Sequence, residues 1–212
     1  MSKLDLKRNK AKPSVKQKAG KTRLSSSRKN SKEKDGRQQL SLSLSHDENS
    51  TKKDLLDIYK KMALARRLDE KQLIMLKQGK AFFHIGCSGH EASQMAAAQN
   101  MIPGKDWSYP YYRDAALCLG LGMTSKEQLL SFLAKADDPN SGGRQMPQHY
   151  GHKDLRIVSQ SSPTGTQFLQ AVGCAMSRKW ENDHEIVYVS SGEGSTSEGE
   201  FHEALNWASR ER

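Results

Sequence analysis

Apolar side chains recur at helical spacing after residue 50 and predict one long helix. The series consists of Leu55, Ile58, Met62, Leu68, Ile74 and Met75. Thr51-Lys52-Lys53-Asp54 resembles a capping box, and Gly79 suits the position just after a last helical turn. We therefore expect this helix to begin at Thr51 and to end before Gly79.

Shorter periodic segments predict further helices. The Ala-rich segment 90–100 ends at Pro103-Gly104 and suits close packing, and Thr124-Ser125-Lys126-Glu127 resembles a second capping box. The expected helices cover 90–100, 114–121, 124–136 and, from about Pro163, a segment that ends near Trp180. Residues 137–151 form a long loop, and loops of this length in compact domains usually carry function or move.

Two segments have the apolar character of buried strands. Ile157-Val158-Ser159 is a short candidate and Glu185–Val189 a stronger one, whereas 109–113 is expected to be a connection. Strands that alternate with helices pair in parallel, because each helix carries the chain back to the edge where the next strand begins. The expected fold class is therefore α/β, with a doubly wound parallel sheet.

Charge divides the chain into two parts. Residues 1–37 carry fourteen Lys and Arg against three acidic residues, whereas the remaining 175 carry twenty basic and twenty-one acidic side chains. Residues 1–50 contain no aromatic residue and few apolar ones, so they cannot bury enough surface to fold. We expect a disordered tail at 1–50 and one domain, itself incomplete, at 51–212.

A solvated extension or docking arm is the favoured interpretation of the tail. Its clustered Lys could instead follow the phosphates of nucleic acid or acidic lipid, although nucleic-acid binding is not expected. A mitochondrial presequence is a third alternative, but such segments are Arg-rich and acid-poor, and here Lys outnumbers Arg. We expect a cytoplasmic bacterial protein, with the mitochondrial matrix as the alternative.

The three cysteines, Cys87, Cys118 and Cys174, are widely spaced and form no Cys-x-x-Cys pair. Their odd number without a secretory signal argues for a reducing compartment, so we expect core thiols. The longest apolar stretch, 115–123, is far shorter than the roughly 20 residues that a membrane helix needs. We expect a soluble protein that does not enter a membrane.

A carboxylate flanked by glycines, Gly192-Glu193-Gly194, follows the strand predicted at Glu185–Val189. Ligands of open α/β sheets lie outside the carboxyl ends of the strands, where glycines admit a pyrophosphate and a carboxylate can hold Mg²⁺. Taken alone, the turn is equally compatible with an ordinary strand-to-helix connection whose acidic residue favours the helix N-terminus.

Two other segments carry groups that bind phosphate or cations. Tyr112-Arg113 lies at a predicted helix start, where the guanidinium can hold a phosphate through two hydrogen bonds; a surface ion pair is the alternative. The turn Ser161–Gln167 combines hydroxyls, an amide and bent backbone, which suits a monovalent cation or a heterocycle; simple N-capping by Ser162 is the alternative.

The order and spacing of these motifs resemble the alpha subunit of thiamine-diphosphate-dependent 2-oxoacid dehydrogenases, over about residues 51–212. The matching segments are Tyr111-Tyr112-Arg113-Asp114, Gly143-Arg144-Gln145-Met146-Pro147 with His149, Ser162-Pro163, Gly192-Glu193-Gly194 and Ser197-Glu198-Gly199, with Phe83 and Gly89-His90-Glu91-Ala92. Arg-Gln-Met-Pro and the glutamate at 193 are most similar to the branched-chain (2-oxoisovalerate) enzymes. Pyruvate and acetoin dehydrogenases are the alternatives.

The resemblance implies a site for thiamine diphosphate and Mg²⁺. Glu193 would be the first magnesium ligand, although many relatives have Asp there. Arg113 and Tyr112 would contact the diphosphate, and Ser162 and Thr164 the aminopyrimidine side. The implied cofactor-binding residues are Tyr111, Tyr112, Arg113, Ser162, Pro163, Thr164, Gly192, Glu193, Gly194, Ser195, Thr196, Ser197 and Glu198.

The same resemblance implies further roles. The implied potassium ligands are Ser161, Pro163, Thr166 and Gln167, and the implied substrate-pocket residues are Phe83, Tyr112, Met146 and Ser162. Three histidines, His84, His90 and His149, are candidate acids or bases. Lone histidines in loops and at helix starts are mostly structural, which is the interpretation favoured here.

The implied activity is oxidative decarboxylation of a branched-chain 2-oxoacid of the 3-methyl-2-oxobutanoate type, with acyl transfer to the lipoyl group of a dihydrolipoyl acyltransferase. A beta subunit or a fused beta domain would complete the site, in an α2β2 assembly or, if fused, a homodimer. In the family an Asn pair and a catalytic His follow later in the chain, so we expect an amino-terminal fragment that is inactive by itself. A noncatalytic binding or assembly protein that uses its basic tail is the alternative from another class.

Overall fold

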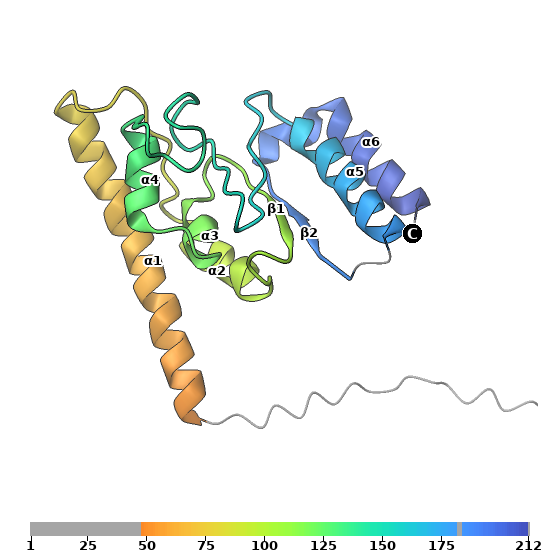
Figure 1. Ribbon diagram of the computed structural model, residues 1–212, viewed down its shortest axis with the longest axis horizontal. Helices are drawn as coiled ribbons and strands as arrows, with labels where there is room; N and C mark the ends of the chain where they lie inside the picture. Colours follow the sequence, from red (N-terminus) through yellow and green to blue (C-terminus); the bar gives the residue numbers. More distant parts are fainter. Residues whose placement is uncertain (1–47, 182–183, 212) are drawn as a thin grey trace, which may run out of the picture. The chain divides into compact units, whose positions relative to one another are not determined.

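The computed structural model describes residues 48–181 and 184–211, with side chains from Lys52 onward. The tail expected at 1–50 lies, up to residue 47, outside the described residues. The elements in chain order are α1 (Glu48–Lys77), α2 (Glu91–Gln99), β1 (Trp107–Tyr109), α3 (Ala115–Gly120), α4 (Ser125–Phe132), α5 (Thr166–Trp180), β2 (Val187–Val189), the 3₁₀ helix η1 (Glu193–Ser197) and α6 (Gly199–Arg210) (Figure 1).

The predicted long helix is α1, and its predicted end is confirmed. Gly79 has a φ of 69°, and the N–H of Lys80 donates to the carbonyl of Met75 at 3.0 Å, as in a Schellman ending. The start predicted at Thr51 is wrong, because the helix already begins at Glu48. Since no Gly or Pro separates these positions, the capping-box pattern lies inside the first turns.

The other predicted helices are confirmed with shorter bounds. At the start of α4 the capping box forms: Glu127 N–H donates to Thr124 Oγ1 at 3.2 Å, and Thr124 N–H donates to Glu127 Oε2 at 2.7 Å. The helix α5 begins at Thr166 and not near Pro163, because Gly165, with a φ of 95°, turns the chain immediately before it.

The expected parallel sheet is confirmed in the pairing of β1 with β2. The register partners are Trp107 with Val187, Ser108 with Tyr188 and Tyr109 with Val189. The strand predicted at Glu185–Val189 is shortened to its last three residues. The strand predicted at 157–159 is reduced to a single parallel bridge between Ile157 and Ser108.

The strand β1 corrects the expectation that Tyr109 belongs to a connection. Its three residues are too few to show a periodicity of two, so the sequence pattern carries no strand signal there. Pairing with both β2 and Ile157 makes this short segment the centre of the sheet.

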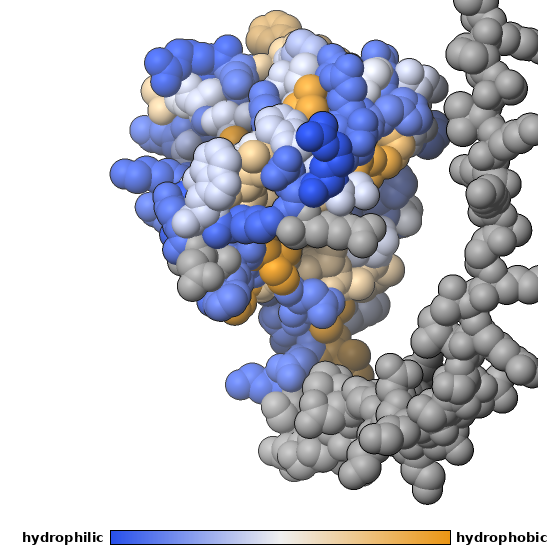
Figure 2. Space-filling view, turned by 90° about the vertical axis from the view of Figure 1, so that its right-hand side faces the viewer, coloured by the Kyte–Doolittle hydropathy of each residue, from blue (hydrophilic) through white to orange (hydrophobic). Residues whose placement is uncertain are grey.

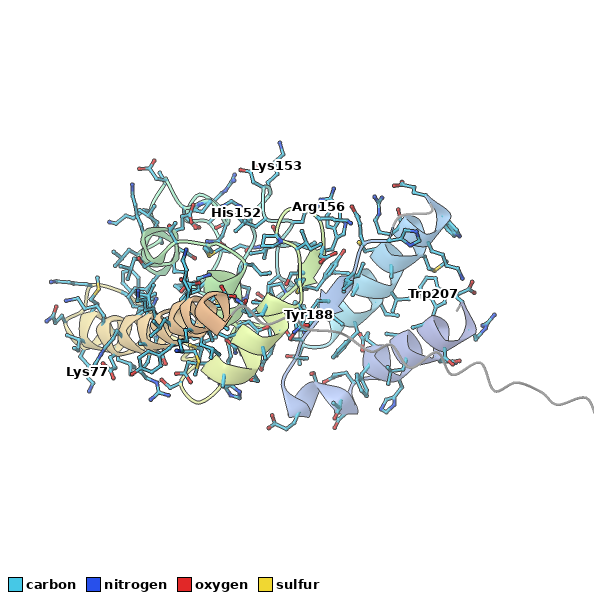
Figure 3. The ribbon with its side chains drawn as sticks, turned by 90° about the horizontal axis from the view of Figure 1, so that it is seen from below. Lys77, His152, Lys153, Arg156, Tyr188 and Trp207 are labelled. Carbon is cyan, nitrogen blue, oxygen red and sulfur yellow. The ribbon has the colours of Figure 1, made fainter. Side chains whose placement is uncertain are left out.

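Helices cover both faces of the sheet: α1 to α4 lie on one side, and α5 and α6 on the other (Figure 1). Tyr188, which Figure 3 shows between the two groups of helices, packs against the core beside α2 and α3, whereas Val187 and Val189 face α5 and α6. Successive side chains of β2 therefore pack into apolar layers on opposite faces of the sheet.

Two clusters of buried side chains form the core on the side of α1 to α4. One contains Ala98, Met101, Leu117, Cys118, Leu121, Met123, Tyr150 and Ile157, and the other Ala65, Leu68, Cys87, Met95, Ala116 and Leu119. The helix α3 contributes to both. It approaches α2 so closely that a Cβ on Gly120 would lie 2.4 Å from that of Ala98, which confirms the close packing expected of the Ala-rich helix.

A third apolar region lies between α5, α6 and β2, where a groove of about 310 Å³ is lined by side chains such as Phe168, Val189 and Phe201. Figure 2, which views the molecule from the right-hand side of Figure 1, shows hydrophobic patches within a mainly hydrophilic surface.

Two of the three cysteines are the core thiols that we expected. Cys87 and Cys118 are completely buried, and burial raises the pKa of the Cys87 thiol to about 12; Cys174 is half-buried. Among the described residues no helix combines the length and the apolar character that crossing a bilayer requires.

Thr124→Ala is expected to lower the free energy of unfolding by about 1 kcal/mol, because the N–H of Glu127 loses its acceptor. Thr124→Ser keeps the hydroxyl and should stay within about 0.5 kcal/mol of the wild type. Urea unfolding followed by circular dichroism measures both changes. Equal losses in the two variants would show that the hydroxyl does not stabilise α4.

Candidate functional site

The parallel pairing of β1 and β2 places the carboxyl ends of the two strands, where the chain leaves the sheet, side by side. Tyr109 and Val189 are register partners, and the N–H of Ser190 donates to the carbonyl of Tyr109 at 3.2 Å. The segments that follow, 110–114 and 190–193, therefore lie side by side at the carboxyl edge of the sheet, where α/β folds bind their ligands. They contain Arg113 and Glu193, the two charged residues expected to meet a diphosphate and a metal ion.

A buried carboxylate, Asp114, ties these two segments together. Its Oδ2 accepts hydrogen bonds from the N–H of Tyr111 at 2.9 Å and from the hydroxyl of Ser190. Burial raises the pKa of Asp114, and the hydrogen bonds from Ser190 and Tyr111 act in the opposite direction. The carboxylate thereby holds the turn before α3 against the end of β2.

Gln94 on α2 supports the same turn from behind. Its Nε2 donates to the carbonyl of Arg113 at 3.0 Å and to Asp114 Oδ1 at 3.2 Å, while its Oε1 accepts from the N–H groups of Ala116 and Leu117. No side chain caps α3 from its own N-cap position. One buried amide therefore caps α3 and orients the backbone of Arg113.

A polar cavity of about 340 Å³ lies between these segments. It is lined by His90, Gln94, Tyr111, Arg113, Asp114, Ser191, Gly192 and Glu193. A guanidinium that can bind phosphate oxygens and a carboxylate that can bind a hard cation thus border one space.

The side chain of Tyr111 leaves no room for a side chain at Gly192. A Cβ there would lie 2.9 Å from Tyr111 Oη, and the ring of Tyr111 is stacked on that of Tyr112 with centroids 3.8 Å apart. Burial, followed by the contact with Tyr112, raises the pKa of Tyr111 to about 12, so its hydroxyl stays protonated at neutral pH. The guanidinium of Arg113 and the carboxylate of Glu193, which line the same polar cavity, fit a diphosphate with its metal ion.

Comparison with known protein families gives a match over most of the described residues. The family model described as dehydrogenase E1 component matches residues 59–211. The chain belongs to the dehydrogenase E1 component family.

The relatives of this E1 chain include three alpha subunits of 2-oxoisovalerate dehydrogenase. The protein from Bacillus subtilis (strain 168) is 46% identical over 158 residues, which are 74% of this chain and 48% of the relative. The mitochondrial protein from Caenorhabditis elegans is 35% identical over 77% of this chain and 38% of the relative, and that from Homo sapiens 34% over 77% and 36%. The chain spans about half the length, or less, of the relatives that it matches.

The residues after Glu193 shape the turn that presents this carboxylate and do not line the cavity. Ser195 is buried, and its Oγ donates to the carbonyl of Gly192 at 2.6 Å; Thr196 Oγ1 donates to the carbonyl of Glu193 at 2.7 Å. Gly194, Ser197 and Glu198 are exposed and do not line the cavity. These hydroxyls therefore hold η1 in its tight turn, which presents Glu193.

The first turn of α5 approaches the same edge of the sheet through the side chain of Gln167. Gln167 Nε2 donates to the carbonyl of Ser190 at 3.3 Å and to Ser191 Oγ at 3.2 Å. Of the residues expected to bind potassium, Thr166 Oγ1 lies 3.1 Å from the carbonyl oxygen of Pro163, to which it donates. Ser161 is half-buried.

The residues expected to contact the aminopyrimidine and the substrate lie outside the cavity. Ser162, Pro163 and Thr164 are exposed, and Ser162 Oγ lies 2.7 Å from Nε2 of the buried His149. Phe83 is half-buried and Met146 is half-exposed. Of the residues expected to bind the diphosphate and the metal ion, Arg113 and Glu193 line the cavity, whereas Tyr112 does not.

The candidate histidines occupy different positions. His90 lines the cavity, His149 is buried against Ser162, and the side chain of His84 is buried beside Asp69. Among residues 48–181 and 184–211, no three His, Cys, Asp or Glu side chains converge to hold a metal ion. Glu193 is the carboxylate at the cavity mouth, and Asp114 is its buried counterpart.

Sequence reasoning missed Gln94 and the structural role of Asp114. The four partners of Gln94 lie 19 to 23 residues away along the chain, and Ser190 lies 76 residues from Asp114. A polar residue inside an apolar helix, such as Gln94 in the Ala-rich α2, was the available signal, because buried amides need partners.

Gly192→Ala is expected to lower the free energy of unfolding by about 1–3 kcal/mol, because the new Cβ forces the stacked ring of Tyr111 to move. Gly194→Ala, in the same turn, meets nothing within 4 Å and should change it by less than about 0.5 kcal/mol. Thermal unfolding measures both. Similar losses in the two variants would contradict the tight fit at Gly192.

Proposed function

We propose that the chain is the alpha part of a thiamine-diphosphate-dependent dehydrogenase that acts on branched-chain 2-oxoacids. The observation that carries the proposal is the cavity bordered by Arg113 and Glu193, because a diphosphate with its Mg²⁺ ion needs a cation and a carboxylate side by side. The three relatives compared above are named as alpha subunits of 2-oxoisovalerate dehydrogenase, which favours branched-chain acids over pyruvate.

The residues of this chain would bind and orient the cofactor. Arg113 would donate to the terminal phosphate oxygens, and Glu193 would supply one oxygen ligand to Mg²⁺. When bound, thiamine diphosphate supplies the electron sink that stabilises the acyl carbon as CO₂ leaves. The protein's contribution is position and charge: Asp114 and Gln94 hold the guanidinium-bearing turn, and Tyr111 lines one side of the cavity.

The remaining parts of the site belong to the same proposal. Ser162 and Thr164 would meet the aminopyrimidine, and Phe83 and Met146 the substrate. A potassium ion bound by Ser161, Pro163, Thr166 and Gln167 would steady the loop before α5, whose Gln167 contacts the end of β2. A beta subunit or fused beta domain and a lipoyl-bearing acyltransferase would be the partners.

Thiamine diphosphate with Mg²⁺ is expected to raise the unfolding temperature of the protein in its native assembly. At 100 times Kd the stabilisation amounts to about 2.7 kcal/mol. Glu193→Ala should abolish this shift, since the ion loses the ligand that this chain supplies. Differential scanning calorimetry measures the shift.

Two controls make this experiment specific. Glu203→Ala removes an exposed carboxylate from α6 and should leave the shift intact, and thiamine without its diphosphate should produce none. A wild-type protein that gains no stability from thiamine diphosphate would contradict the proposal and favour a noncatalytic binding or assembly role.

A further inference from the structure

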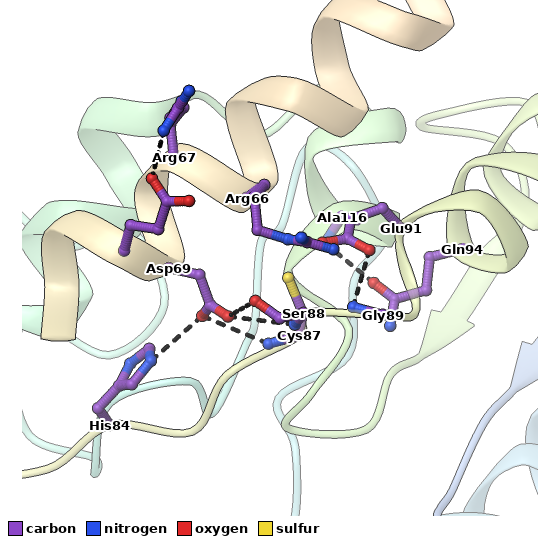
Figure 4. Close-up of polar contacts among 11 residues, drawn as sticks. Arg66, Arg67, Asp69, His84, Cys87, Ser88, Gly89, Glu91, Gln94 and Ala116 are labelled. Atoms are coloured by element: carbon purple, nitrogen blue, oxygen red, sulfur yellow. Dashed lines mark hydrogen bonds and ion pairs between the residues drawn. The ribbon is translucent and has the colours of Figure 1, made fainter.

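The loop of residues 84–89 is held by side chains from other parts of the chain. The N–H groups of Cys87 and Ser88 donate to the carboxylate of Asp69 at 3.3 and 3.1 Å, and the N–H of Gly89 donates to Glu91 Oε2 at 2.9 Å (Figure 4). Three successive backbone donors thus end on two carboxylates, which fixes the course of the loop.

Asp69, on α1, binds two of these three backbone N–H groups. It is 5% exposed, and its Oδ2 also accepts from the hydroxyl of Ser88 at 2.6 Å. A Cβ on Gly86 would lie 2.7 Å from the same oxygen, so the loop backbone rests directly on the carboxylate. Burial acts to raise the pKa of Asp69, but hydrogen bonding from His84 and Ser88 outweighs it, so the pKa lies below the usual value.

The hydrogen bonds around His84 determine which nitrogen of its neutral ring carries the proton. The N–H of Ile85 donates to Gln148 Oε1 at 2.7 Å, so the amide nitrogen of Gln148 is the atom 3.0 Å from His84 Nδ1. That nitrogen donates, and Nδ1 accepts. The proton of the neutral ring is therefore on Nε2, which lies 3.2 Å from Asp69 Oδ1.

The loop of residues 84–89 is also hydrogen-bonded to Arg113, the cation that lines the cofactor cavity. The carbonyl of Gly86 accepts a hydrogen bond from Arg113 Nη1 at 3.2 Å. Two groups therefore orient the guanidinium of the exposed Arg113: this carbonyl, one residue before the two N–H groups bound by Asp69, and the ring of Tyr112, whose centroid lies 5.8 Å from Cζ.

We propose that Asp69 is a positioning residue for Arg113: by fixing the carbonyl of Gly86, it sets where the guanidinium lies for a diphosphate. The inference rests on the proposed function, since it assumes that the anion bound in the cavity carries phosphate groups. Asp69 does not border the cavity, so it acts only through the loop.

Asp69→Asn is the sharp substitution because it preserves shape and removes only acceptor capacity. The groups that donate hydrogen bonds to the carboxylate are two backbone N–H groups and the hydroxyl of Ser88. The hydroxyl can turn to accept, but the N–H groups cannot, so the new NH₂ faces a donor in either orientation. The loop, and with it the carbonyl of Gly86, must shift.

The test is a double-mutant cycle on the affinity for thiamine diphosphate with Mg²⁺, measured by titration calorimetry on the native assembly. Asp69→Asn should raise Kd about tenfold in the wild-type background. Arg113→Lys keeps a charge, so binding stays measurable, but its single ammonium cannot hold the carbonyl and a phosphate in a fork. In that background Asp69→Asn should change Kd by less than about twofold.

The proposal would be overturned if Asp69→Asn changed Kd by the same factor in the wild-type and Arg113→Lys backgrounds, because a merely structural role would act independently of Arg113. It would also be overturned if Asp69→Asn left the Kd of the wild type unchanged. Asp57→Asn, an exposed carboxylate paired with Lys61 on the same helix, is the matched control and should leave Kd unchanged. If Asp69→Asn does not fold, Ser88→Ala removes one bond of the anchor and should show a smaller loss with the same dependence on Arg113.

Inorganic pyrophosphate, as a second probe, separates this inference from the proposed function. If the wild type binds pyrophosphate but not thiamine diphosphate, the proposed cofactor is wrong, and the same cycle with pyrophosphate decides whether Asp69 positions Arg113. A wild type that binds neither probe would overturn both proposals.

Discussion

The parallel pairing of β1 with β2 is the constraint on which the rest of the molecule depends. Three register pairs bring Tyr109 and Val189 side by side, although 80 positions separate them, and both strands then release the chain at the same edge. The segment after β1 leads to Arg113, and the segment after β2 leads to Glu193. A shift of one residue in this register would send the side chains of β2 to the opposite faces and would part Ser190 from Asp114. The cavity is thus a consequence of strand register.

Around this edge the chain uses buried polar side chains as fixed supports. Asp114 holds the two exits together, Gln94 caps α3 beneath them, and Asp69 anchors the loop that reaches Arg113. A buried carboxylate is costly unless every oxygen has donors, and here backbone N–H groups supply three of the six hydrogen bonds that Asp114 and Asp69 accept. Such groups cannot rotate away, so the same bonds that offset burial also fix the geometry of the cavity wall.

The sequence allows the fold class and the two charged residues of the cavity to be predicted, because these depend on local patterns. Capping boxes, a glycine at a helix end and glycines around a carboxylate are short-range signals, and Thr124, Gly79 and Glu193 lie where such signals place them. The residues that support the site are different. Gln94 and Asp69 read as ordinary helix positions until the tertiary contacts are known, because their partners come from other elements. The three-residue β1 was missed for the same reason, since only pairing defines it. The roles expected of Phe83, Met146 and Thr164 stay predictions.

The central claim is that Arg113 and Glu193, from two strand exits, hold one diphosphate with its metal ion. Anomalous diffraction from the native assembly crystallised with thiamine diphosphate and Mn²⁺ tests it most directly. The account predicts a manganese peak bound to the carboxylate of Glu193, with the diphosphate between that ion and the guanidinium of Arg113. A manganese peak elsewhere, or a diphosphate outside this cavity, would contradict it.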